Sequence, residues 1–281
     1  MSGGDRIVVV TGAASGIGRR LVDDLLAQGD RVLAADIDGG ALDAIDGWPA
    51  ERVVRRALDV RDPEAWGETL AAASAAFGGV DVVMNVAGVL RPGAIASSSA
   101  EDVDFHLDVN LKGVIHGTRA AARLMVEQGR GHIINIASLA SMAPVPGLGL
   151  YVASKYGVRG FSMAAAQELR PRGVFVSCVC PDAVRTPMLD LQVDYPEAAI
   201  TFTAPRFLTP EDVSALVLGQ VMRRRPVIAS LPRSRAFLAR LSDLFPAVAT
   251  RLVAVLDKKG RKVQEKERRA AAAGGPGSSS R

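Results

Sequence analysis

Short apolar runs alternate along the chain with stretches in which apolar residues recur every three or four positions. The runs are bounded by turn residues and stand at residues 7–10, 31–35, 53–57, 80–86, 132–137, 174–179 and 227–231. Runs of this length predict buried strands, and the period between them predicts helices. Strands that alternate with helices form βαβ units. We therefore expect an α/β fold: a doubly wound, seven-stranded parallel sheet with helices on both faces.

Glycines mark the expected ends of three of these helices, because a residue just past a helix often adopts a left-handed conformation that glycine tolerates. The three are residues 17–28 before Gly29, residues 63–77 before Gly78 and Gly79, and residues 103–128 before Gly129.

A chain of 281 residues with 48% hydrophobic content is long enough for one large domain with a buried core. We expect that domain over residues 1–232, a basic amphipathic extension over 233–269, and a disordered tail over 270–281, which reads AAAAGGPGSSSR. The charge supports this division. Residues 1–222 hold 19 Lys/Arg and 26 Asp/Glu, a net charge of −7, whereas residues 223–269 hold 14 and 4, a net charge of +10.

The extension combines apolar helical spacing with basic residues. Its apolar stripe comprises Phe237, Leu238, Leu241, Leu244, Phe245, Val248, Leu252, Val255 and Leu256. Pro246 is expected to divide the stripe into two short helices, and a basic cluster follows at 258–262. The pattern is typical of peripheral contact with an anionic lipid surface. Packing on the body, covering of a substrate site and a dimer contact stay open as alternatives.

Several classes of protein are disfavoured. The first apolar run is too short for a signal peptide or a membrane span, so we expect a cytoplasmic protein, with peripheral contact at the inner membrane surface as the further alternative. Cys178 and Cys180 stand two apart in a strand and are expected to be free thiols. The three histidines have no partners at ligand spacing, so no metal site is expected. The basic extension lacks the aromatic interleaving typical of nucleic-acid binding.

A glycine-rich turn follows the first predicted strand and opens the first predicted helix. It reads TGAASGIG from Thr11 to Gly18. Glycines let a backbone approach a pyrophosphate closely, and a helix N-terminus offers free N–H groups with the positive end of the helix dipole. The turn predicts a dinucleotide site, and a purely structural loop is the alternative reading.

Asp36 ends the second predicted strand, 24 residues after Gly12. An acidic side chain at this distance accepts hydrogen bonds from the adenosine ribose hydroxyls. It also repels a 2′-phosphate, and neither Ile37 nor the Ala14-Ser15 pair offers a compensating cation. Asp36 therefore predicts NAD rather than NADP, with a solvated turn residue as the alternative.

Further motifs follow in a fixed order: Asn85-Val86-Ala87-Gly88 after the fourth strand, then Asn110, Ser138 and the pair Tyr151-x-x-x-Lys155. Together with the glycine turn and Asp59-Val60, they resemble the short-chain dehydrogenase/reductase family over roughly residues 5–230. The resemblance implies a Rossmann-fold oxidoreductase that binds NAD. It also implies a homo-oligomer, a dimer or tetramer formed through the helices that contain Asn110 and Tyr151.

The resemblance implies a set of cofactor-binding residues. They are Gly12, Ser15, Gly16, Ile17, Gly18, Asp36, Asp59, Val60, Asn85, Ala87, Gly88, Tyr151, Lys155, Pro181, Val184 and Thr186. One departure falls beside this set, because Pro181 is followed by Asp182 where the family usually has glycine. Aspartate tolerates unusual backbone angles better than most residues, so the turn is expected to survive.

Alcohol oxidation by NAD needs a base for the hydroxyl proton, since the nicotinamide carries the hydride. Tyr151 and Lys155 stand four apart in a predicted helix and share a face, so a nearby ammonium is expected to lower the pKa of the phenol. This predicts Tyr151 as general acid/base. By resemblance, Lys155 also holds the nicotinamide ribose, Ser138 donates to the substrate oxygen, and Asn110 kinks a long helix and holds a water.

The segments beside these residues, 139–150 and 187–189, are mostly apolar and favour a lipophilic secondary alcohol or ketone, although ordinary loop packing explains them equally well. Residues 190–208 occupy the place of a substrate lid in the family. An NADP-dependent ketoreductase and a non-catalytic nucleotide-binding protein at a membrane surface are the competing hypotheses.

Overall fold

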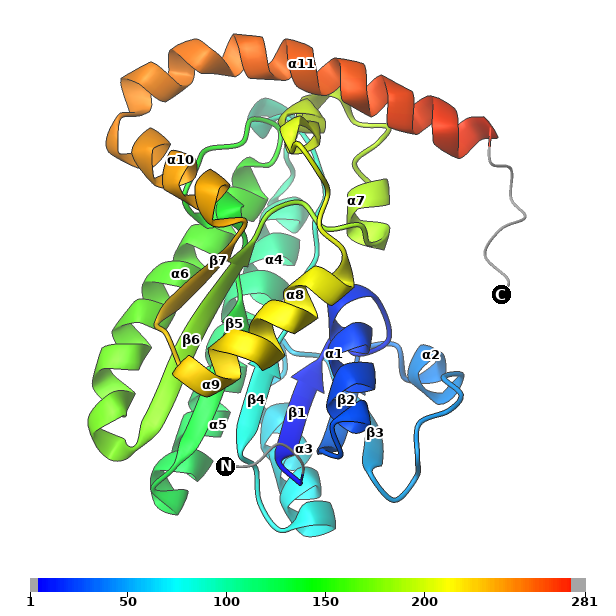
Figure 1. The fold of residues 1–281 in the computed structure, drawn as a ribbon, viewed down its shortest axis with the longest axis vertical. Coiled ribbons are helices and arrows are strands. Elements are labelled where there is room, and N and C mark those ends of the chain that lie inside the picture. The colour runs from blue at the N-terminus through cyan, green and yellow to red at the C-terminus, as the bar shows by residue number, and fades with distance from the viewer. Residues whose placement is uncertain (1–4, 274–281) are drawn as a thin grey trace.

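All seven predicted runs form strands of one parallel sheet, and the predicted fold class is confirmed. The computed structural model describes residues 5–273, without the side chains of residues 246, 248, 249, 252–254, 272 and 273. The strands are β1 (Ile7–Thr11), β2 (Arg31–Asp36), β3 (Val53–Ala57), β4 (Val82–Asn85), β5 (Gly131–Ile136), β6 (Val174–Pro181) and β7 (Ile228–Leu231). Their order across the sheet is β3-β2-β1-β4-β5-β6-β7 (Figure 1). The order reverses between β1 and β4, which is where such sheets bind ligands at the carboxyl ends of the strands.

Helices connect the strands. The α-helices described are α1 (Gly16–Ala27), α2 (Gly39–Asp43), α3 (Pro63–Phe77), α4 (Ala100–Leu107), α5 (Gly113–Gln128), α6 (Gly149–Leu169), α7 (Pro187–Asp190), α8 (Pro210–Leu216), α9 (Met222–Arg224), α10 (Arg233–Leu244) and α11 (Pro246–Ala273). Shorter 3₁₀ and π segments are η1 (Ile95–Ser97), η2 (Asp108–Lys112), η3 (Leu139–Ser141), η4 (Arg170–Arg172), η5 (Pro196–Thr203) and η6 (Val217–Val221).

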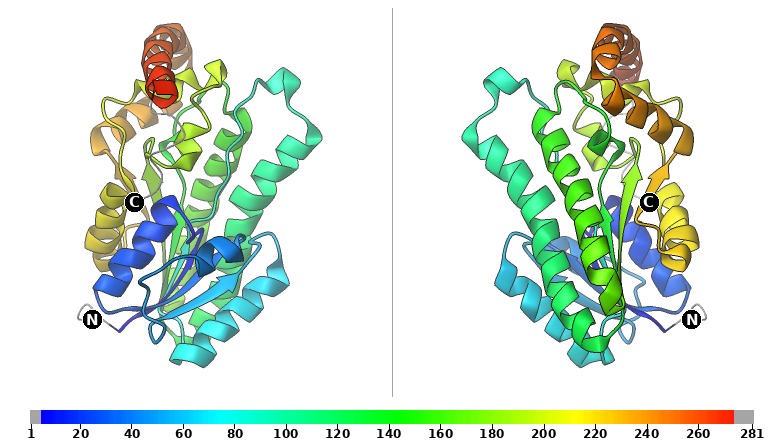
Figure 2. Two further views of the ribbon diagram at one scale, coloured as in Figure 1. Left: turned by 90° about the vertical axis from the view of Figure 1, so that its right-hand side faces the viewer. Right: turned by 90° about the vertical axis from the view of Figure 1, so that its left-hand side faces the viewer.

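Helices cover both faces of the sheet, with α1, α8 and α9 on one side and α3, α5 and α6 on the other (Figure 2). The valines of β1 explain why. Val8 and Val10 belong to the core cluster that includes the apolar residues of α1 and α8, whereas Val9 belongs to the cluster under α3 and α5. Side chains alternate along a strand, so an uninterrupted apolar run requires cover on both faces.

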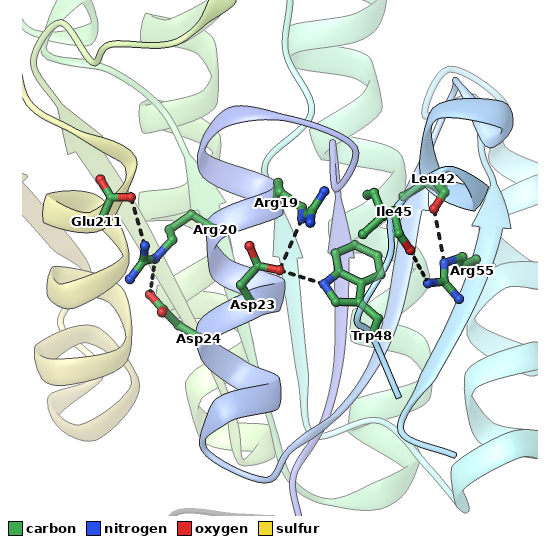
Figure 3. Close-up of polar contacts among 9 residues, drawn as sticks. All are labelled: Arg19, Arg20, Asp23, Asp24, Leu42, Ile45, Trp48, Arg55 and Glu211. Carbon is green, nitrogen blue, oxygen red and sulfur yellow. Dashed lines mark hydrogen bonds and ion pairs between the residues drawn. The ribbon is translucent and has the colours of Figure 1, made fainter. Parts of the chain in front are cut away.

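The helix that begins at the glycine turn, α1, is held on both flanks (Figure 3). On one side Arg20 bridges to Glu211 of α8 at 2.9 Å. On the other, the indole of Trp48 donates to Asp23 at 2.6 Å, and the guanidinium of Arg55 lies 5.3 Å from the Trp48 ring. Trp48 is only 8% exposed, so this flank contributes more than an exposed ion pair would. The position of the α1 N-terminus is thereby fixed relative to the sheet.

The helix predicted over residues 103–128 is interrupted. It begins earlier, at Ala100, because Ser99 and Asp102 form a capping box, and it divides into α4 and α5 at the π segment η2. Asn110 lies within η2, as expected for a residue that kinks this helix. The predicted ends at glycine are confirmed, since Gly29, Gly78 and Gly129 all have positive φ angles.

The extension forms two helices that meet at Pro246, so the predicted division is confirmed. The prediction that both helices are short is wrong for α11, which has 28 residues and continues through residues 270–273 of the predicted tail. Residues with high helix propensity dominate this segment, and pairs such as Arg261 with Asp257 support it at i,i+4 spacing. Residues 274–281 lie outside the described residues. In Figure 1, α11 crosses the top of the molecule, above the carboxyl ends of the strands.

Candidate active site

A cavity of about 770 Å³ lies at the carboxyl ends of the central strands. Ser138, Tyr151 and Lys155 line it together with Ile17 from α1 and Thr186 from the segment after β6. Its volume falls within the range of small-molecule sites. Residues that are far apart in the sequence therefore meet in one cavity, as the motifs predict.

The glycine turn has the geometry of a close-approach loop. Gly12 and Gly16 have φ angles of +66° and +52°, which favour glycine. A Cβ at Gly12 would lie 3.0 Å from the backbone of Ala87, and one at Gly18 would overlap the carbonyl of Gly12. A Cβ at Gly16 would lie 3.1 Å from Thr186 Cγ2, in the segment after β6. The spacing of the three glycines is thus required by the fold itself.

Thr11 ties this turn to the end of β4, a contact that the sequence reasoning missed. Its hydroxyl accepts from the amides of Val86 and Ala87 at 3.1 and 3.2 Å. At the start of α1, the side chain of Ser15 makes no capping hydrogen bond within the described structure. The first amides of α1 stay free to bind an anion beside the loop.

Asp36 lies beside the same loop. Its two carboxylate oxygens accept from the amides of Ala14 and Asp38 at 3.0 and 3.1 Å. A carboxylate has further acceptor capacity, which suits the two hydroxyls of a ribose. Among the described residues Asp36 takes part in no ion pair, and the neighbouring Ile37 is 67% exposed. A 2′-phosphate placed here would meet a carboxylate and an apolar side chain.

Three predicted cofactor residues have other partners. Asp59 forms an exposed ion pair with Arg61 at 2.6 Å, and this guanidinium lowers the pKa of the carboxyl. Val60 is buried. The amide of Asn85 is also buried and donates to Asn135 Oδ1 at 2.7 Å, inside the sheet core. The Asn85 side chain therefore holds strands β4 and β5 together and is not among the side chains that line the cavity.

Tyr151 and Lys155 lie one turn apart on α6, with the Lys155 ammonium 5.6 Å from the Tyr151 ring centroid. Both are buried, at 8% and 3% exposed. Lys155 Nζ donates to the carbonyl of Ile136 at 3.1 Å, which directs the ammonium toward the end of β5. Gly88 also faces this group, since a Cβ there would lie 3.4 Å from Lys155 Nζ.

The pKa predicted for the phenol has the wrong direction in this structure. Burial raises the pKa of Tyr151 to about 12, and the Ser138 side chain acts against that rise. Burial also lowers the pKa of the Lys155 ammonium to about 8. Burial removes both groups from water, and for Tyr151 this outweighs the opposing effect of the Ser138 side chain.

Ser138 and Asn110 flank this pair. Ser138 caps η3 by accepting from the amide of Ala140 at 3.1 Å. Asn110 is fully buried, accepts from the amide of Val89 at 2.8 Å and donates to the Val89 carbonyl at 2.9 Å. Its amide also donates to Ser154 on α6 at 3.2 Å. Asn110 therefore joins the π segment to the loop after β4 and to the helix of Tyr151.

The segment after β6 begins with Asp182, which continues the hydrogen bonds between β6 and β7. The Asp182 amide donates to the carbonyl of Leu231 at 2.8 Å, and the residue does not adopt a positive φ angle. A glycine is therefore not required here, and the expectation that the turn survives is confirmed. Val184 pairs with Leu208 in a parallel bridge, and Thr186 Oγ1 donates to the Val184 carbonyl at 3.3 Å.

The comparisons with known proteins match this geometry. A family profile described as short chain dehydrogenase matches residues 6–195, which is more than half of the chain. The chain belongs to this family. Its members are NAD(P)-dependent dehydrogenases and reductases that act on alcohol and ketone groups, and this protein is an oxidoreductase of that class.

Short chain dehydrogenases from bacteria are among its relatives. A 3-alpha-(or 20-beta)-hydroxysteroid dehydrogenase from Mycobacterium tuberculosis is 37% identical over 215 residues, covering 76% of this chain and 81% of the relative. A 2-(R)-hydroxypropyl-CoM dehydrogenase from Xanthobacter autotrophicus is 36% identical over 199 residues, 68% and 80% of the two chains. A solved short chain dehydrogenase/reductase from Burkholderia phymatum, in complex with NAD, has a TM-score of 0.79 and 28% identity, covering 88% and 96% of the two chains.

The extension completes the cavity of this short chain dehydrogenase. Arg235, Leu238, Leu241, Phe245 and Leu256 all line it, and sequence reasoning did not assign them to the site. Covering of the substrate site was one of the alternatives for the apolar stripe. The sequence feature that pointed to this alternative was Asp182, because a carboxylate in an apolar cavity needs a cationic partner.

No cluster of metal-ligating side chains occurs in the part of the chain that the structure describes. Among its described helices, none is both long and apolar enough to cross a bilayer.

Proposed function

We propose that the protein transfers a hydride between NAD(H) and a lipophilic secondary alcohol or ketone. The observation that carries this proposal is the convergence of Ser138, Tyr151 and Lys155 in a largely apolar cavity that also reaches the glycine turn through Ile17. When bound, the nicotinamide supplies the hydride. The chain must then move one proton and hold one oxygen.

Tyr151 is proposed to exchange the proton with the substrate oxygen, as the base in oxidation and the acid in reduction. At neutral pH its hydroxyl is protonated, because burial raises its pKa to about 12. The protonated form is the one that donates to a ketone in reduction. Ser138 is proposed to donate to the same oxygen, and Lys155 and Asn110 to position Tyr151 and the ribose.

The cofactor proposal rests on Asp36 and the glycine turn. The free amides of α1 suit a pyrophosphate, and the Asp36 carboxylate suits unmodified ribose hydroxyls. Ser15, Gly16, Ile17 and Gly18 would hold the pyrophosphate. Pro181, Val184 and Thr186 would meet the nicotinamide end, opposite Gly16. These residues fit NAD, and the solved relative in complex with NAD is consistent with it.

The cavity walls support a lipophilic substrate. Apolar side chains from four separate segments face it, including Leu90, Leu148, Met188 and Ile200. Two charged residues of the lining, Asp182 and Arg235, form an ion pair with each other. The name of the mycobacterial relative, a hydroxysteroid dehydrogenase, is consistent with an alcohol of this polarity.

We propose that residues 1–232 form the catalytic domain and residues 233–269 an extension that completes its cavity. The proposal includes a cytoplasmic location and a homo-oligomer, a dimer or tetramer. Part of α6 is covered by the extension, because the Tyr156 hydroxyl donates to Asp243 of α10 at 2.9 Å. An assembly through α6 would therefore use the rest of that helix.

A screen of secondary alcohols and sterols with NAD, and of the matching ketones with NADH, tests the proposal. Absorbance of the reduced nicotinamide reports turnover. We expect lipophilic secondary alcohols or ketones to react and sugars and charged hydroxy acids not to react. The same screen with NADP(H) is the control for cofactor. Higher kcat/KM with NADP(H), or a preference for polar substrates, would contradict the proposal.

A further inference from the structure

The outer face of α10 carries large apolar side chains that are exposed. Phe237, Leu241 and Leu244 follow one another at spacings of four and three, so they share a face of the helix. Phe237 and Leu244 are 63% and 71% exposed. The opposite face carries Ala236, which packs with residues of β6 and α6 in the core. Apolar side chains of this size on the outside of a helix mark a surface that contacts something else.

This apolar face is continuous with the mouth of the active-site cavity. Leu238, Leu241, Phe245 and Leu256 are exposed at the surface and also line the cavity. Phe237, Leu244 and Val255 extend the same surface beyond the cavity. We call these seven residues the mouth surface. A molecule that reaches the cavity from this side passes over these apolar side chains.

The two helices that carry the mouth surface are firmly attached to the body. Arg235 of α10 pairs with Asp182 at 2.5 Å. Gln264 of α11 is buried and donates to the carbonyls of Gln192 and Tyr195 at 2.8 and 2.7 Å. Gly260 packs against the backbone of η5 so closely that a Cβ there would overlap a carbonyl. The mouth surface is therefore held in place, with its apolar face outward.

The outer face of α11 is basic. Arg251, Lys258 and Lys262 stand seven and four residues apart, which places them on one face. Lys258 and Lys262 each precede a buried residue, Gly260 and Gln264, by two positions, so this face points away from η5. All three side chains are exposed, and within the described residues none of them forms an ion pair. The charge here is free to meet anions.

We propose that the mouth surface and the basic face of α11 dock on an anionic lipid surface, and that the substrate is a lipophilic alcohol or ketone dissolved in that lipid. The apolar side chains of α10 enter the headgroup boundary, and the basic side chains of α11 meet the headgroups. The substrate then enters the cavity between Leu238, Phe245 and Leu256 without crossing water. The lipid contact is independent of the proposed reaction, whereas the statement about the substrate rests on it.

The position of the cavity favours lipid over a second copy of the chain. A second copy seated on the mouth surface would cover the entrance to the cavity. A lipid surface leaves the entrance facing the phase in which a lipophilic substrate is most concentrated. The exposed basic side chains beside it favour an anionic occupant, and the headgroups supply one.

Vesicle co-sedimentation with the full-length protein tests the docking. We expect binding to vesicles of phosphatidylcholine with phosphatidylglycerol, and about tenfold or more weaker binding to phosphatidylcholine alone. Two double variants should each reduce binding to the anionic vesicles by a similar factor. One is Lys258→Glu with Lys262→Glu, and the other is Phe237→Ser with Leu244→Ser. Arg172→Glu with Arg224→Glu is the matched control, because both side chains are exposed, take part in no ion pair among the described residues, and undergo the same change of charge away from α10 and α11. It should bind as the wild type does.

Equal recovery of the wild type in the supernatant with both vesicle types would overturn the docking. A second outcome would also overturn it: the wild type does not bind vesicles, and sedimentation velocity shows an oligomer that dissociates in the Phe237→Ser with Leu244→Ser variant. A second copy of the chain would then be the occupant of the mouth surface. Equal loss of binding in the Arg172→Glu with Arg224→Glu control would show non-specific attraction and would also overturn it.

Turnover of a vesicle-borne sterol tests the substrate statement. Phe237 and Leu244 do not line the cavity, so their double variant should lose about tenfold in rate on the vesicle-borne sterol and none on a water-soluble secondary alcohol. Equal rates for variant and wild type on the vesicle-borne sterol would contradict entry from lipid. Binding to vesicles without turnover of any alcohol or ketone would leave the docking intact and would refute the proposed function.

Discussion

The carboxylate of Asp182 lies 2.5 Å from the guanidinium of Arg235 and joins the end of β6 to the first turn of α10. Asp182 is 10% exposed at its side chain, and burial raises its pKa while Arg235 acts in the opposite direction. Arg235 also donates to the carbonyl of Thr203 in η5 at 3.4 Å. One guanidinium thus connects the end of the sheet, η5 and the extension.

Removing one partner of this pair should destabilise the protein. We expect Arg235→Met to lower the free energy of unfolding by about 3 kcal/mol, because it leaves a carboxylate in an apolar cavity. Asp182→Asn with Arg235→Met should recover most of that loss. Urea unfolding of the two single variants and the double variant measures the coupling. Additive effects in this cycle would contradict the pairing.

The hydroxyl of Tyr151 should be essential for turnover. Tyr151→Phe keeps the ring and removes the group proposed to transfer the proton, so kcat should fall by about a thousandfold. NADH binding, followed by fluorescence of the reduced nicotinamide, should stay nearly unchanged. A variant that retains a tenth or more of the wild-type rate would show that another group transfers the proton.

Asp36 should set the choice of cofactor. Asp36→Ala should weaken NAD by about tenfold or more, since two charge-assisted hydrogen bonds to the ribose are lost. Asp36→Ala with Ile37→Arg should improve kcat/KM for NADP further by giving the phosphate a partner. Ile37→Arg alone is the control. Steady-state kinetics with both cofactors decide, and a wild type that prefers NADP would sink the assignment.

Lys155 should make stability depend on pH in the alkaline range. Burial lowers its pKa from 10.5 to about 8, so the unfolded chain binds more protons than the folded chain between these values. Stability must therefore rise with pH across that window. Relative to Lys155→Met, the wild type should gain about 3 kcal/mol between pH 8 and pH 10.5. Urea unfolding at several pH values measures the difference, and a difference independent of pH would contradict the shift.

The sheet and most of the cavity could be predicted from the sequence. Apolar runs covered on both faces, such as the valines of β1, leave a periodic signal, and each run found became a strand. The glycines at 12, 16 and 18 are equally legible, because a positive φ angle or a close backbone contact excludes every larger side chain. Such constraints are local, because each depends on the identity of one or two residues.

Other features depended on which segments meet in space. The sequence could not show that the amide of Asn85 points into the core toward Asn135, because a strand end offers both faces. It predicted a lowered pKa for Tyr151 from the nearness of Lys155, whereas burial by the whole cavity raises it. Desolvation is summed over many distant residues, and no local pattern records it.

The extension combines features that the sequence determines with features that only the tertiary structure decides. Its amphipathic period and its break at Pro246 were determined by the sequence alone, since helix geometry and the missing amide of proline act locally. Which surface its apolar residues would meet was decided by tertiary structure. The pairing of Arg235 with Asp182, 53 positions apart, turns α10 so that Leu238 and Phe245 line the cavity while Phe237 and Leu244 stay exposed. Contacts between segments so far apart are selected by the free energy of the whole packed chain, and for that reason only the folded structure reveals them.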